Sequence, residues 1–306
     1  MLDLHTHSTF SDGSDTPTQL AEKAHHLGIS AIALTDHDTT LSHDEMSAAC
    51  ARLGLESVTG VEVSLRDTEF PRVRDGVTTP RNVHVLAYFL PLEAEHPLQQ
   101  KLAALRHDRD RRNHTLVTML QEKGFEDLSL AYLTEMTGNP DSIGRPHFAR
   151  AMIDLHPELV GEKNEDTWNR IFVDWLGTDG RAYVSKTSMP IEEFVDAARG
   201  SGTVFSIAHP LVNYVDEINP TSIEATMPRV MASLRERGFA GVEANYGGTS
   251  AGIRALMVKL TRDAGMIPTG GSDYHGTYKT DVLLGFGRTG DLRVPDEVLD
   301  ELKAAR

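Results

Sequence analysis

The chain lacks the features that mark most secreted and membrane proteins. Its 306 residues include a single cysteine, Cys50, so no disulfide bond can form within the chain. No apolar run reaches the roughly 18 residues that indicate a membrane-spanning helix. The N-terminus has neither the basic segment nor the apolar segment of a signal peptide. These absences predict a cytoplasmic protein with no membrane partner.

The chain also has fewer basic residues than acidic residues. The chain has 30 lysines and arginines against 45 aspartates and glutamates, and its formal net charge is −15 at pH 7. Long nucleic acids are bound mainly through cationic contacts to their phosphates, so we do not expect such a partner. Several acidic residues belong to the metal site proposed below, where divalent cations would offset their charge and allow a small phosphate to bind.

Short apolar runs rich in strand-forming residues alternate with helical patterns. Strands are expected at residues 2–7, 31–35, 56–63, 83–89, 203–208, 241–245 and 267–271. Helices are expected between them at residues 17–27, 42–53, 190–199, 222–237 and 251–264. This alternation predicts an α/β fold of parallel strands joined by helical crossovers. Seven strands are one fewer than a complete eightfold barrel contains.

One long segment interrupts the alternation. Residues 95–189 are polar and show no convincing buried strand, while leucines recur there at helical spacing, as at Leu98 and Leu102. We therefore expect a helical insertion domain at residues 95–189. The barrel domain would be formed by residues 1–94 and 190–306.

Two polar segments are expected to lie outside the core. The basic run at residues 106–112 alternates in charge sign, which is typical of a solvated helix face rather than a binding patch. Residues 70–81 contain Pro71, Gly76 and Pro80, which favours a loop.

Histidines and carboxylates recur where the predicted strands end. Because parallel barrel strands end at one mouth, residues far apart in the sequence should meet there. Imidazoles and carboxylates are ligands of divalent metal ions. The candidate metal ligands are His5, His7, Asp12, His37, Glu62, His84, His209, Asp273 and His275. The sequence therefore predicts a metallohydrolase with more than one metal ion.

Residue spacing supports several of these ligands. His5 and His7 lie two residues apart on a strand, which places both side chains on the same face. The same spacing separates Asp273 from His275. Glu62 could bridge two cations held about 3.5–4 Å apart, and the alternative is a salt bridge within the mouth.

The evidence for the remaining ligands is weaker when each residue is considered alone. A lone histidine on an apolar strand, such as His84, is more often a core residue, but His209 before Pro210 offers a second ligand for the same ion. Asp12 lies in a turn sequence and could be a turn former. Asp36 and Asp38 could orient a ligating imidazole or act as simple caps, and Glu243 is expected to be a structural acid or to orient a ligand. Histidines expected at the surface are His25, His26, His43, His96, His107, His114 and His156.

In their order along the chain, these motifs resemble those of the PHP (polymerase and histidinol phosphatase) superfamily. The motifs are the opening HTHS, then TDHD, GVE, a mid-chain HP and the late GSDYH. The GRPHFAR stretch at residues 144–150 resembles the branch of small phosphoesterases that cleave nucleoside 3',5'-bisphosphates or trim short RNA from its 5' end. The resemblance implies a distorted (β/α)7 barrel with a helical insertion, which agrees with the independent strand count.

The resemblance also implies a centre of up to three clustered cations. The first would be held by His5, His7, Glu62 and Asp273. The second would be held by Asp12, His37 and His275, although many members of the superfamily have a histidine in place of Asp12. The third would share Glu62 and be completed by His84 and His209. With nitrogen and oxygen ligands only, Mn, Fe and Zn all remain candidates.

The implied reaction is hydrolysis of a phosphomonoester by attack of a metal-bound hydroxide. The favoured substrate is a nucleoside 3',5'-bisphosphate, with release of the 3'-phosphate. Arg145 and His147 match residues that bind substrate phosphate in this branch, unless they are an exposed pair at a helix start, and Arg181 is a weaker candidate. Two alternatives stay open: a 5'-to-3' exoribonuclease acting on a short oligoribonucleotide, and a non-catalytic metal-binding module that scaffolds a partner.

Overall fold

The computed structural model describes all residues except 75, 178 and 186–187. Within the described residues, seven strands follow one another in a single sheet in the order β1-β2-β3-β4-β6-β7-β8. Their bounds are β1 (Leu2–Thr6), β2 (Ala31–Leu34), β3 (Glu56–Arg74), β4 (Val77–Tyr88), β6 (Val204–Ile207), β7 (Gly241–Tyr246) and β8 (Ile267–Gly271). The short β5 (Met189–Pro190) pairs with β3 beside this path.

The sheet nearly closes into a barrel where β8 meets β1. The segment after β8 runs alongside β1, and the backbone N–H of Asp273 donates to His5 O at 2.9 Å. The N–H of His7 donates in turn to Tyr274 O at 3.0 Å. The close approach needs a glycine, because a Cβ on Gly271 would lie 2.4 Å from His5 N. The distorted seven-stranded barrel is thus confirmed.

The expectation that all strands are parallel is wrong for β4. The pairs β1–β2, β2–β3, β6–β7 and β7–β8 are parallel, but β4 is antiparallel to both β3 and β6. Only two residues separate β3 from β4 in the sequence. A parallel connection needs a crossover of a dozen residues or so, so these two strands must form a hairpin.

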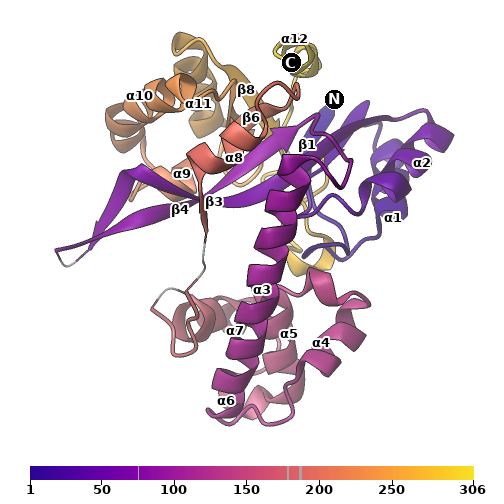
Figure 1. Ribbon diagram of the computed structural model, residues 1–306, viewed down its shortest axis with the longest axis vertical. Helices are drawn as coiled ribbons and strands as arrows, with labels where there is room; N and C mark the ends of the chain where they lie inside the picture. Colours follow the sequence, from indigo (N-terminus) through magenta and orange to yellow (C-terminus); the bar gives the residue numbers. More distant parts are fainter. Residues whose placement is uncertain (75, 178, 186–187) are drawn as a thin grey trace.

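The loop expected at residues 70–81 is also wrong, because this segment belongs to the β3–β4 hairpin. Figure 1 shows the hairpin projecting well beyond the barrel. The ladder pairs Asp67 with Arg81 and resumes with Arg72 opposite Thr79. Pro71 and Pro80 both lie in the irregular stretch between these pairs. Neither proline therefore has to donate a ladder hydrogen bond, which is the condition under which strands tolerate proline.

Helices of the barrel lie close to the expected ranges. They are α1 (Pro17–His26), α2 (His43–Leu53), α8 (Ile191–Ala197), α10 (Pro220–Glu236) and α11 (Ala251–Asp263), with the unexpected additions α9 (Pro210–Tyr214) and α12 (Glu297–Ala304). Local sequence explains where α1 begins. Thr16, directly before Pro17, is the N-cap residue and forms a reciprocal capping box with Gln19. Among the helices described, none is both long and apolar enough to span a membrane.

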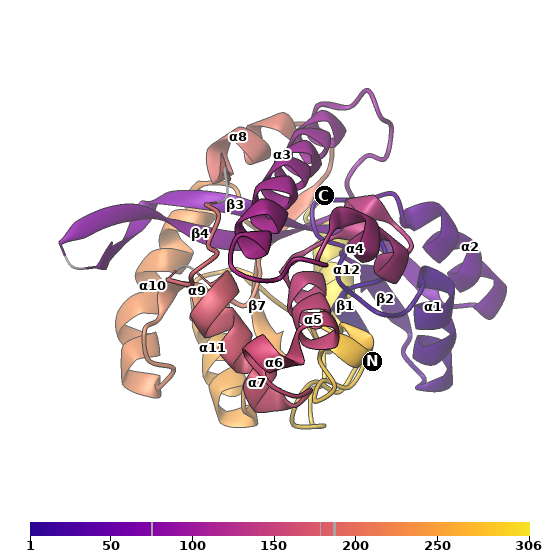
Figure 2. The same cartoon turned by 90° about the horizontal axis from the view of Figure 1, so that it is seen from below.

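Helices also fill the segment between β4 and β5. They are α3 (Pro97–Gln121), α4 (Leu130–Thr137), α5 (Arg145–Leu155), α6 (Pro157–Val160) and α7 (Glu165–Ile171), followed by a π-helical turn (Phe172–Leu176). Leu98 and Leu102 of α3 pack in the barrel core, whereas Leu116 and Leu120 belong to a separate apolar cluster of this segment. Two separate cores support our proposal of a barrel domain and a helical insertion domain. Figure 2 shows α3, α5 and α7 in front of the barrel strands.

Two histidines expected at the surface are buried. The side chain of His43 donates from Nε2 to Gly60 O at 2.7 Å, which ties the start of α2 to β3. His156 is also buried and stacks edge-on against Phe125 in the helical segment. Both residues begin or end helices, where a polar side chain can be enclosed if it finds a backbone or aromatic partner.

Candidate metal centre

The structure brings all nine predicted metal ligands together at one mouth of the barrel. His5 lies on β1, and the side chains that follow strands β1, β2, β6 and β8 are those of His7, Asp12, His37, His209, Asp273 and His275. Every one of the nine has an atom within 4.0 Å of another member of the set. Position at or after a strand end was therefore enough to predict this convergence for all of the nine except Glu62 and His84.

Glu62 and His84 reach the mouth from the interior of strands. The prediction that Glu62 ends its strand is wrong, because β3 and β4 continue past the mouth into the hairpin. Glu62 lies opposite Leu86, and His84 lies opposite Ser64. Residues two apart on β3 share a face, as do residues directly opposite each other in the ladder. The pleat therefore directs Glu62 and His84 to the same side of the hairpin.

The carboxylate of Glu62 is surrounded by five imidazoles. Its Oε2 lies 3.2 Å from His5 Nε2, 3.2 Å from His7 Nε2 and 3.1 Å from His37 Nδ1. Its Oε1 lies 2.8 Å from His84 Nδ1 and 2.9 Å from His209 Nε2. Burial alone would raise the pKa of Glu62, but the neighbouring imidazoles, His37 and His84 foremost, hold it well below its usual range. Glu62 is therefore an ionised centre that connects the parts of the site.

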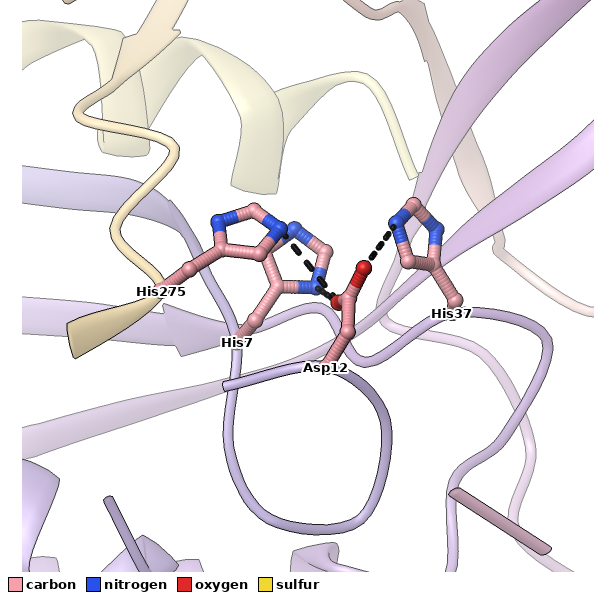
Figure 3. A group of neighbouring side chains, drawn as sticks. All are labelled: His7, Asp12, His37 and His275. Carbon is pink, nitrogen blue, oxygen red and sulfur yellow. Dashed lines mark ion pairs between the residues drawn. The ribbon is translucent and has the colours of Figure 1, made fainter. Parts of the chain in front are cut away.

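The two aspartates complete the mouth on its other side. Asp12 Oδ1 lies 3.3 Å from His275 Nε2, and Asp12 Oδ2 lies 3.6 Å from His37 Nε2. Figure 3 shows the Asp12 carboxylate between these two rings. Asp273 Oδ1 lies 3.7 Å from His5 Nε2 and 3.5 Å from His7 Nε2. Asp12 thus joins imidazoles that follow two different strands, β2 and β8, whereas Asp273 connects the segment after β8 to the two histidines of β1 and its end.

Three groups of side chains have ligand atoms within 4.8 Å of one another. They are His7, Asp12, His37 and His275; His5, His7 and Asp273; and His37, Glu62 and His84. These groups overlap with the three ligand sets implied by the resemblance, but His7 and His37 each belong to two of them. The assignment of nine ligands to three ions remains our proposal, with these two histidines at the boundaries between ions.

Unpaired ring nitrogens indicate that the mouth fits metal ions. His5 Nε2, His7 Nε2 and His37 Nδ1 are buried and lack a hydrogen-bond partner among the described residues. Buried polar atoms are nearly always paired, so three unpaired nitrogens around one carboxylate need an explanation. Divalent cations coordinated by imidazole and carboxylate provide it.

Glu243 orients two of the candidate ligands. Its buried carboxylate accepts from His5 Nδ1 at 2.8 Å and from the backbone N–H of His209 at 2.6 Å. Because His5 donates from Nδ1, the lone pair of its Nε2 is directed into the mouth. Such hydrogen bonds fix the tautomer and the ring orientation of metal-binding histidines.

Asp36 holds the turn that carries Asp12. Its buried carboxylate accepts hydrogen bonds from the backbone N–H and hydroxyl of Ser8, both at 2.7 Å, and from the hydroxyls of Ser11 at 2.7 Å and Ser42 at 2.6 Å. The turn after β1 is thereby tied to the segment after β2. This fixes Asp12 and His37 relative to each other.

Residues with strained backbone conformations are concentrated at the same mouth. Among described residues other than glycine, positive φ angles occur at Asp38 (56°), Phe89 (57°), His209 (28°) and Asp273 (57°). Three of the four adjoin or belong to the candidate metal centre. Non-glycine residues adopt such angles only where the surroundings impose them, and this strain is common at functional sites.

Arginines of α3 and α5 line a pocket beside the candidate metal centre. The pocket is bounded by Asp12, His37 and His84 on the barrel side and by Arg109, Arg112 and Arg145 on the helical side. Arg109 also donates from Nη2 to His37 O at 2.9 Å and pairs with Asp38. We refer to Arg109, Arg112 and Arg145 as the arginine cluster.

The arginine cluster corrects the interpretation of residues 106–112 as a solvated helix face. Arg112 Nε is buried and has no hydrogen-bond partner within the described chain. Burial, together with the charges of Arg145 and Arg109, lowers the pKa of Arg112 to about 10. The sequence did contain a signal, since Arg106, Arg109 and Arg112 recur every three residues and so share one helix face.

His147 is buried behind the pocket, at the first turn of α5. Its Nδ1 accepts the backbone N–H of Gly144 at 3.0 Å, and its ring meets that of Tyr278 edge-on at 5.2 Å. Burial lowers the pKa of His147 to about 4, so the ring is neutral at pH 7. With Nδ1 as acceptor, the neutral ring carries its proton on Nε2.

Sequence analysis missed several residues around the mouth. A second pocket at the candidate metal centre is lined by Trp168, Phe172, Tyr278 and Lys279 in addition to the metal ligands. Lys279 donates from Nζ to Asp273 Oδ2 at 2.7 Å. Neither the aromatic residues nor Lys279 stands out in the sequence, because single residues on helices and loops carry no periodic signal.

Metal binding at neutral pH is expected to release protons. Burial would lower the pKa of His7, but Asp273 and Glu62 raise it to about 9. Below that pH the metal-free ring holds a proton, whereas ligation requires the neutral form. The affinity for Mn²⁺ should therefore rise with pH up to about pH 9. Calorimetric titration at pH 7 in two buffers of different ionisation enthalpy measures the release, and equal heats in both buffers would contradict it.

Comparison with known proteins agrees with the site geometry. The PHP domain family model matches residues 3–177. A 3',5'-nucleoside bisphosphate phosphatase of Chromobacterium violaceum is 30% identical over 274 residues, covering 90% of this chain and 87% of that protein. A 5'-3' exoribonuclease of Haemophilus influenzae is 27% identical over 277 residues, covering 89% of each chain.

A solved structure is similar over almost the whole length. It comes from Bifidobacterium adolescentis and was assigned as a metal-dependent phosphoesterase. It superimposes with a TM-score of 0.76 at 26% identity, covering 99% of this chain and 96% of that chain. The chain therefore belongs to the PHP family and is a metal-dependent phosphoesterase.

Proposed function

We propose that this phosphoesterase removes the 3'-phosphate of a nucleoside 3',5'-bisphosphate and leaves the nucleoside 5'-monophosphate. One observation carries the proposal: candidate metal ligands and the arginine cluster line the same pocket. Such a pocket has two places for phosphate groups, one at the metal centre and one at the guanidinium groups. A substrate with two phosphates can use both at once.

The metal centre would receive the reacting phosphate. The nine proposed ligands are His5, His7, Asp12, His37, Glu62, His84, His209, Asp273 and His275. Bound divalent cations would supply an activated water molecule and would neutralise charge that develops on the phosphate. Glu243 and Asp36 keep the ligands in place through the hydrogen bonds described above.

The arginine cluster would receive the second phosphate. Arg112 and Arg145 have guanidinium groups at the pocket, and such groups bind phosphate oxygens in a planar, two-pronged geometry. We propose that the Nε2–H of His147 donates to the same phosphate. This remote binding would orient the substrate without taking part in bond cleavage, which is an efficient use of binding energy.

The nucleoside would lie against aromatic rings. Trp168 and Phe172 line the pocket at the metal centre, and their ring centroids are 5.6 Å apart. Phe172 opens the π-helical turn, a local irregularity that often occurs at functional sites. Stacking on an aromatic ring is tolerant of base identity, so we expect little preference among the four bases.

Relatives support this reading of the pocket. The protein that is 30% identical to this chain is named a 3',5'-nucleoside bisphosphate phosphatase. The exoribonuclease at 27% identity favours a second candidate function, removal of nucleotides from the 5' end of short RNA. Both reactions break the same kind of bond, between the 3' oxygen and phosphorus.

A substrate panel tests the proposal. With added Mn²⁺, adenosine 3',5'-bisphosphate should be hydrolysed at least about tenfold more efficiently than adenosine 3'-monophosphate, since one charge-assisted contact contributes roughly 1.5–3 kcal/mol. Chromatography should show adenosine 5'-monophosphate as the product. Equal values of kcat/KM for the two substrates, or release of the 5'-phosphate, would overturn the proposal.

A further inference from the structure

The ring of His37 is oriented differently from the ring of His5. His5 directs Nε2 into the mouth because its Nδ1 donates to Glu243, which lies behind the ligands. Both ring nitrogens of His37 face candidate ligands, since Nδ1 lies 3.1 Å from Glu62 Oε2 and Nε2 lies 3.6 Å from Asp12 Oδ2. Neither nitrogen is left for an orienting hydrogen bond to a residue outside the mouth. The orientation of His37 must therefore be set through its backbone.

The backbone that follows His37 is strained and is held on one side by β3. Asp38 has a φ angle of 56°, which a non-glycine residue adopts only where its surroundings impose it. Its N–H donates to Glu62 O at 3.0 Å, and its Oδ1 accepts the N–H of Ser64 at 2.8 Å. These contacts fix the segment to the strand that carries Glu62, but they reach His37 only through the next residue.

Side chains of α3 hold the same segment from the helical side. Arg106 donates from Nη1 to Asp38 O at 3.0 Å. The hydroxyl of Thr40 donates to Oε1 of Gln99, which is buried, at 2.8 Å. Arg106 and Gln99 are seven residues apart, so they lie on one face of the helix. That face of α3 is therefore attached to the loop that carries a candidate metal ligand.

Arg109 makes the most direct connection between α3 and His37. Its Nη2 donates to His37 O at 2.9 Å, and its guanidinium group forms an ion pair with the carboxylate of Asp38. The two side chains of the ion pair are only 9% and 1% exposed, so salt and solvent screen the pair weakly. Arg109 lies three residues after Arg106 and shares its helix face. One guanidinium group thus fixes the carbonyl of His37 and the side chain of the next residue together.

We propose that Arg109, supported by Arg106, is a positioning residue for the metal ion that His37 binds. From the helical segment it fixes the backbone of a barrel ligand, and so keeps the ring of His37 in the mouth. This role differs from that of Arg112 and Arg145, the two members of the arginine cluster that would bind the second phosphate. The proposal concerns metal binding and holds whichever phosphate ester is the substrate.

Metal titration provides the first test. Arg109→Met keeps a long side chain but removes the guanidinium group. Calorimetric titration of the metal-free protein with Mn²⁺ should show one equivalent bound about 10- to 100-fold more weakly, as is usual when a residue that orients a ligand is replaced. At least one other equivalent should keep its affinity. Unchanged affinity at every site, or the same loss at every site, would overturn the proposal.

A double-mutant cycle identifies the ligand through which Arg109 acts. His37→Ala removes the ring that Arg109 is proposed to position. In that background Arg109→Met should change Mn²⁺ affinity by no more than about twofold, because residues that act through one another are not additive. If the two losses add in full, Arg109 does not act through His37 and the proposal is wrong.

Matched variants separate the contact from the charge. Arg111→Met removes the same charge from the same helix, but its side chain is 66% exposed and pairs with Asp108, so Mn²⁺ binding should not change. Arg109→Lys keeps the charge without the planar fork and should restore part of the lost affinity. Should Arg109→Met fail to fold, Arg106→Met is the second variant. It should weaken the same equivalent by a smaller factor, and unchanged affinity there would contradict the proposal.

Hydrogen exchange tests the connection from the other direction. Residues 106–112 lie between Leu105, which packs in the barrel core, and Leu116, which packs in the core of the helical segment. Because linkage between two sites is reciprocal, an ion bound by His37 should stabilise this stretch of α3. Mn²⁺ should slow amide exchange at residues 106–112 in the parent protein and slow it less in Arg109→Met. Equal slowing in both proteins would count against the proposal.

Kinetics separates positioning from a direct phosphate contact. The Mn²⁺ concentration that gives half-maximal kcat should rise about 10- to 100-fold in Arg109→Met. It should not rise in Arg112→Met, although Arg112 lies only three residues further along α3. If Arg109→Met keeps the Mn²⁺ dependence of the parent and only raises KM for adenosine 3',5'-bisphosphate, Arg109 contacts substrate phosphate. That result would overturn the positioning role and leave the proposed function standing, whereas a parent enzyme that does not hydrolyse the bisphosphate would leave the metal titration decisive.

Discussion

Glu62→Gln is expected to lower kcat by about 10³-fold or more and to reduce the metal content after Mn²⁺ loading. The carboxylate is 1% exposed and lies within 3.2 Å of a ring nitrogen of each of five histidines. Glutamine keeps the shape of the side chain but removes its charge. Without that charge the centre loses the group that can bridge two cations. The five surrounding imidazoles are neutral as ligands and cannot replace the negative charge that would offset the bound ions.

A graded control is available in the same site. Glu243 is also buried, but it contacts His5 Nδ1 and a backbone N–H rather than the mouth itself. Glu243→Gln should therefore cost only about 10- to 100-fold in metal affinity or activity. Elemental analysis and steady-state kinetics measure both effects. A Glu62→Gln protein with full metal content and near-normal kcat would contradict the bridging role.

The convergence of the candidate metal ligands could be predicted from the sequence because its signal is local. His5 and His7 share a face by the period of two in a strand, and the other candidates follow apolar runs that must end at a common mouth. Inferences from two-residue spacing and from strand ends remain valid even when the predicted strand boundaries are wrong by a residue or two. The argument from strand ends was misleading for Glu62. Its strand, β3, continues to Arg74, well beyond the apolar run that ends near Glu62.

The hairpin could not be predicted because little of its outer half is buried. Residues from Val77 to Thr79 are exposed, so no alternation of apolar and polar side chains marks the strand there. Prolines at 71 and 80 favoured a loop, and the bulge that accommodates them depends on pairing between two strands. Register of this kind is set by the tertiary structure and has no signature in either strand alone.

The arginine cluster illustrates a third situation. Two of its members, Arg109 and Arg112, lie on a face of α3 that looks solvated, since acidic residues alternate with them in the sequence. Only the packing of α3, with its first half in the barrel core and its second half in a separate core, turns that face toward the candidate metal centre. Helical periodicity can show that Arg109 and Arg112 share a face, but what the face meets depends on the fold.

Removal of one guanidinium group from the arginine cluster is expected to abolish the preference for a substrate with two phosphate groups over a substrate with one. Arg145→Ala and Arg112→Ala should each lower kcat/KM for adenosine 3',5'-bisphosphate by about 10- to 100-fold, as expected for loss of a charge-assisted contact. The value for adenosine 3'-monophosphate should hardly change, because that substrate has no second phosphate for the cluster to bind. Metal content should also be unchanged, because neither arginine is a candidate ligand.

Arg111→Ala is the matched control for the cluster. It removes the same charge from the same helix, but its side chain is 66% exposed and pairs with Asp108 instead of lining the pocket. The Arg112→Ala, Arg145→Ala double variant should lose less than the product of the two single losses, because both groups contact one anion and their effects are coupled. If Arg112→Ala and Arg145→Ala slow the monophosphate as much as the bisphosphate, the second phosphate is not bound there. The pocket beside the metal centre would then act on phosphomonoesters without regard to a second charge.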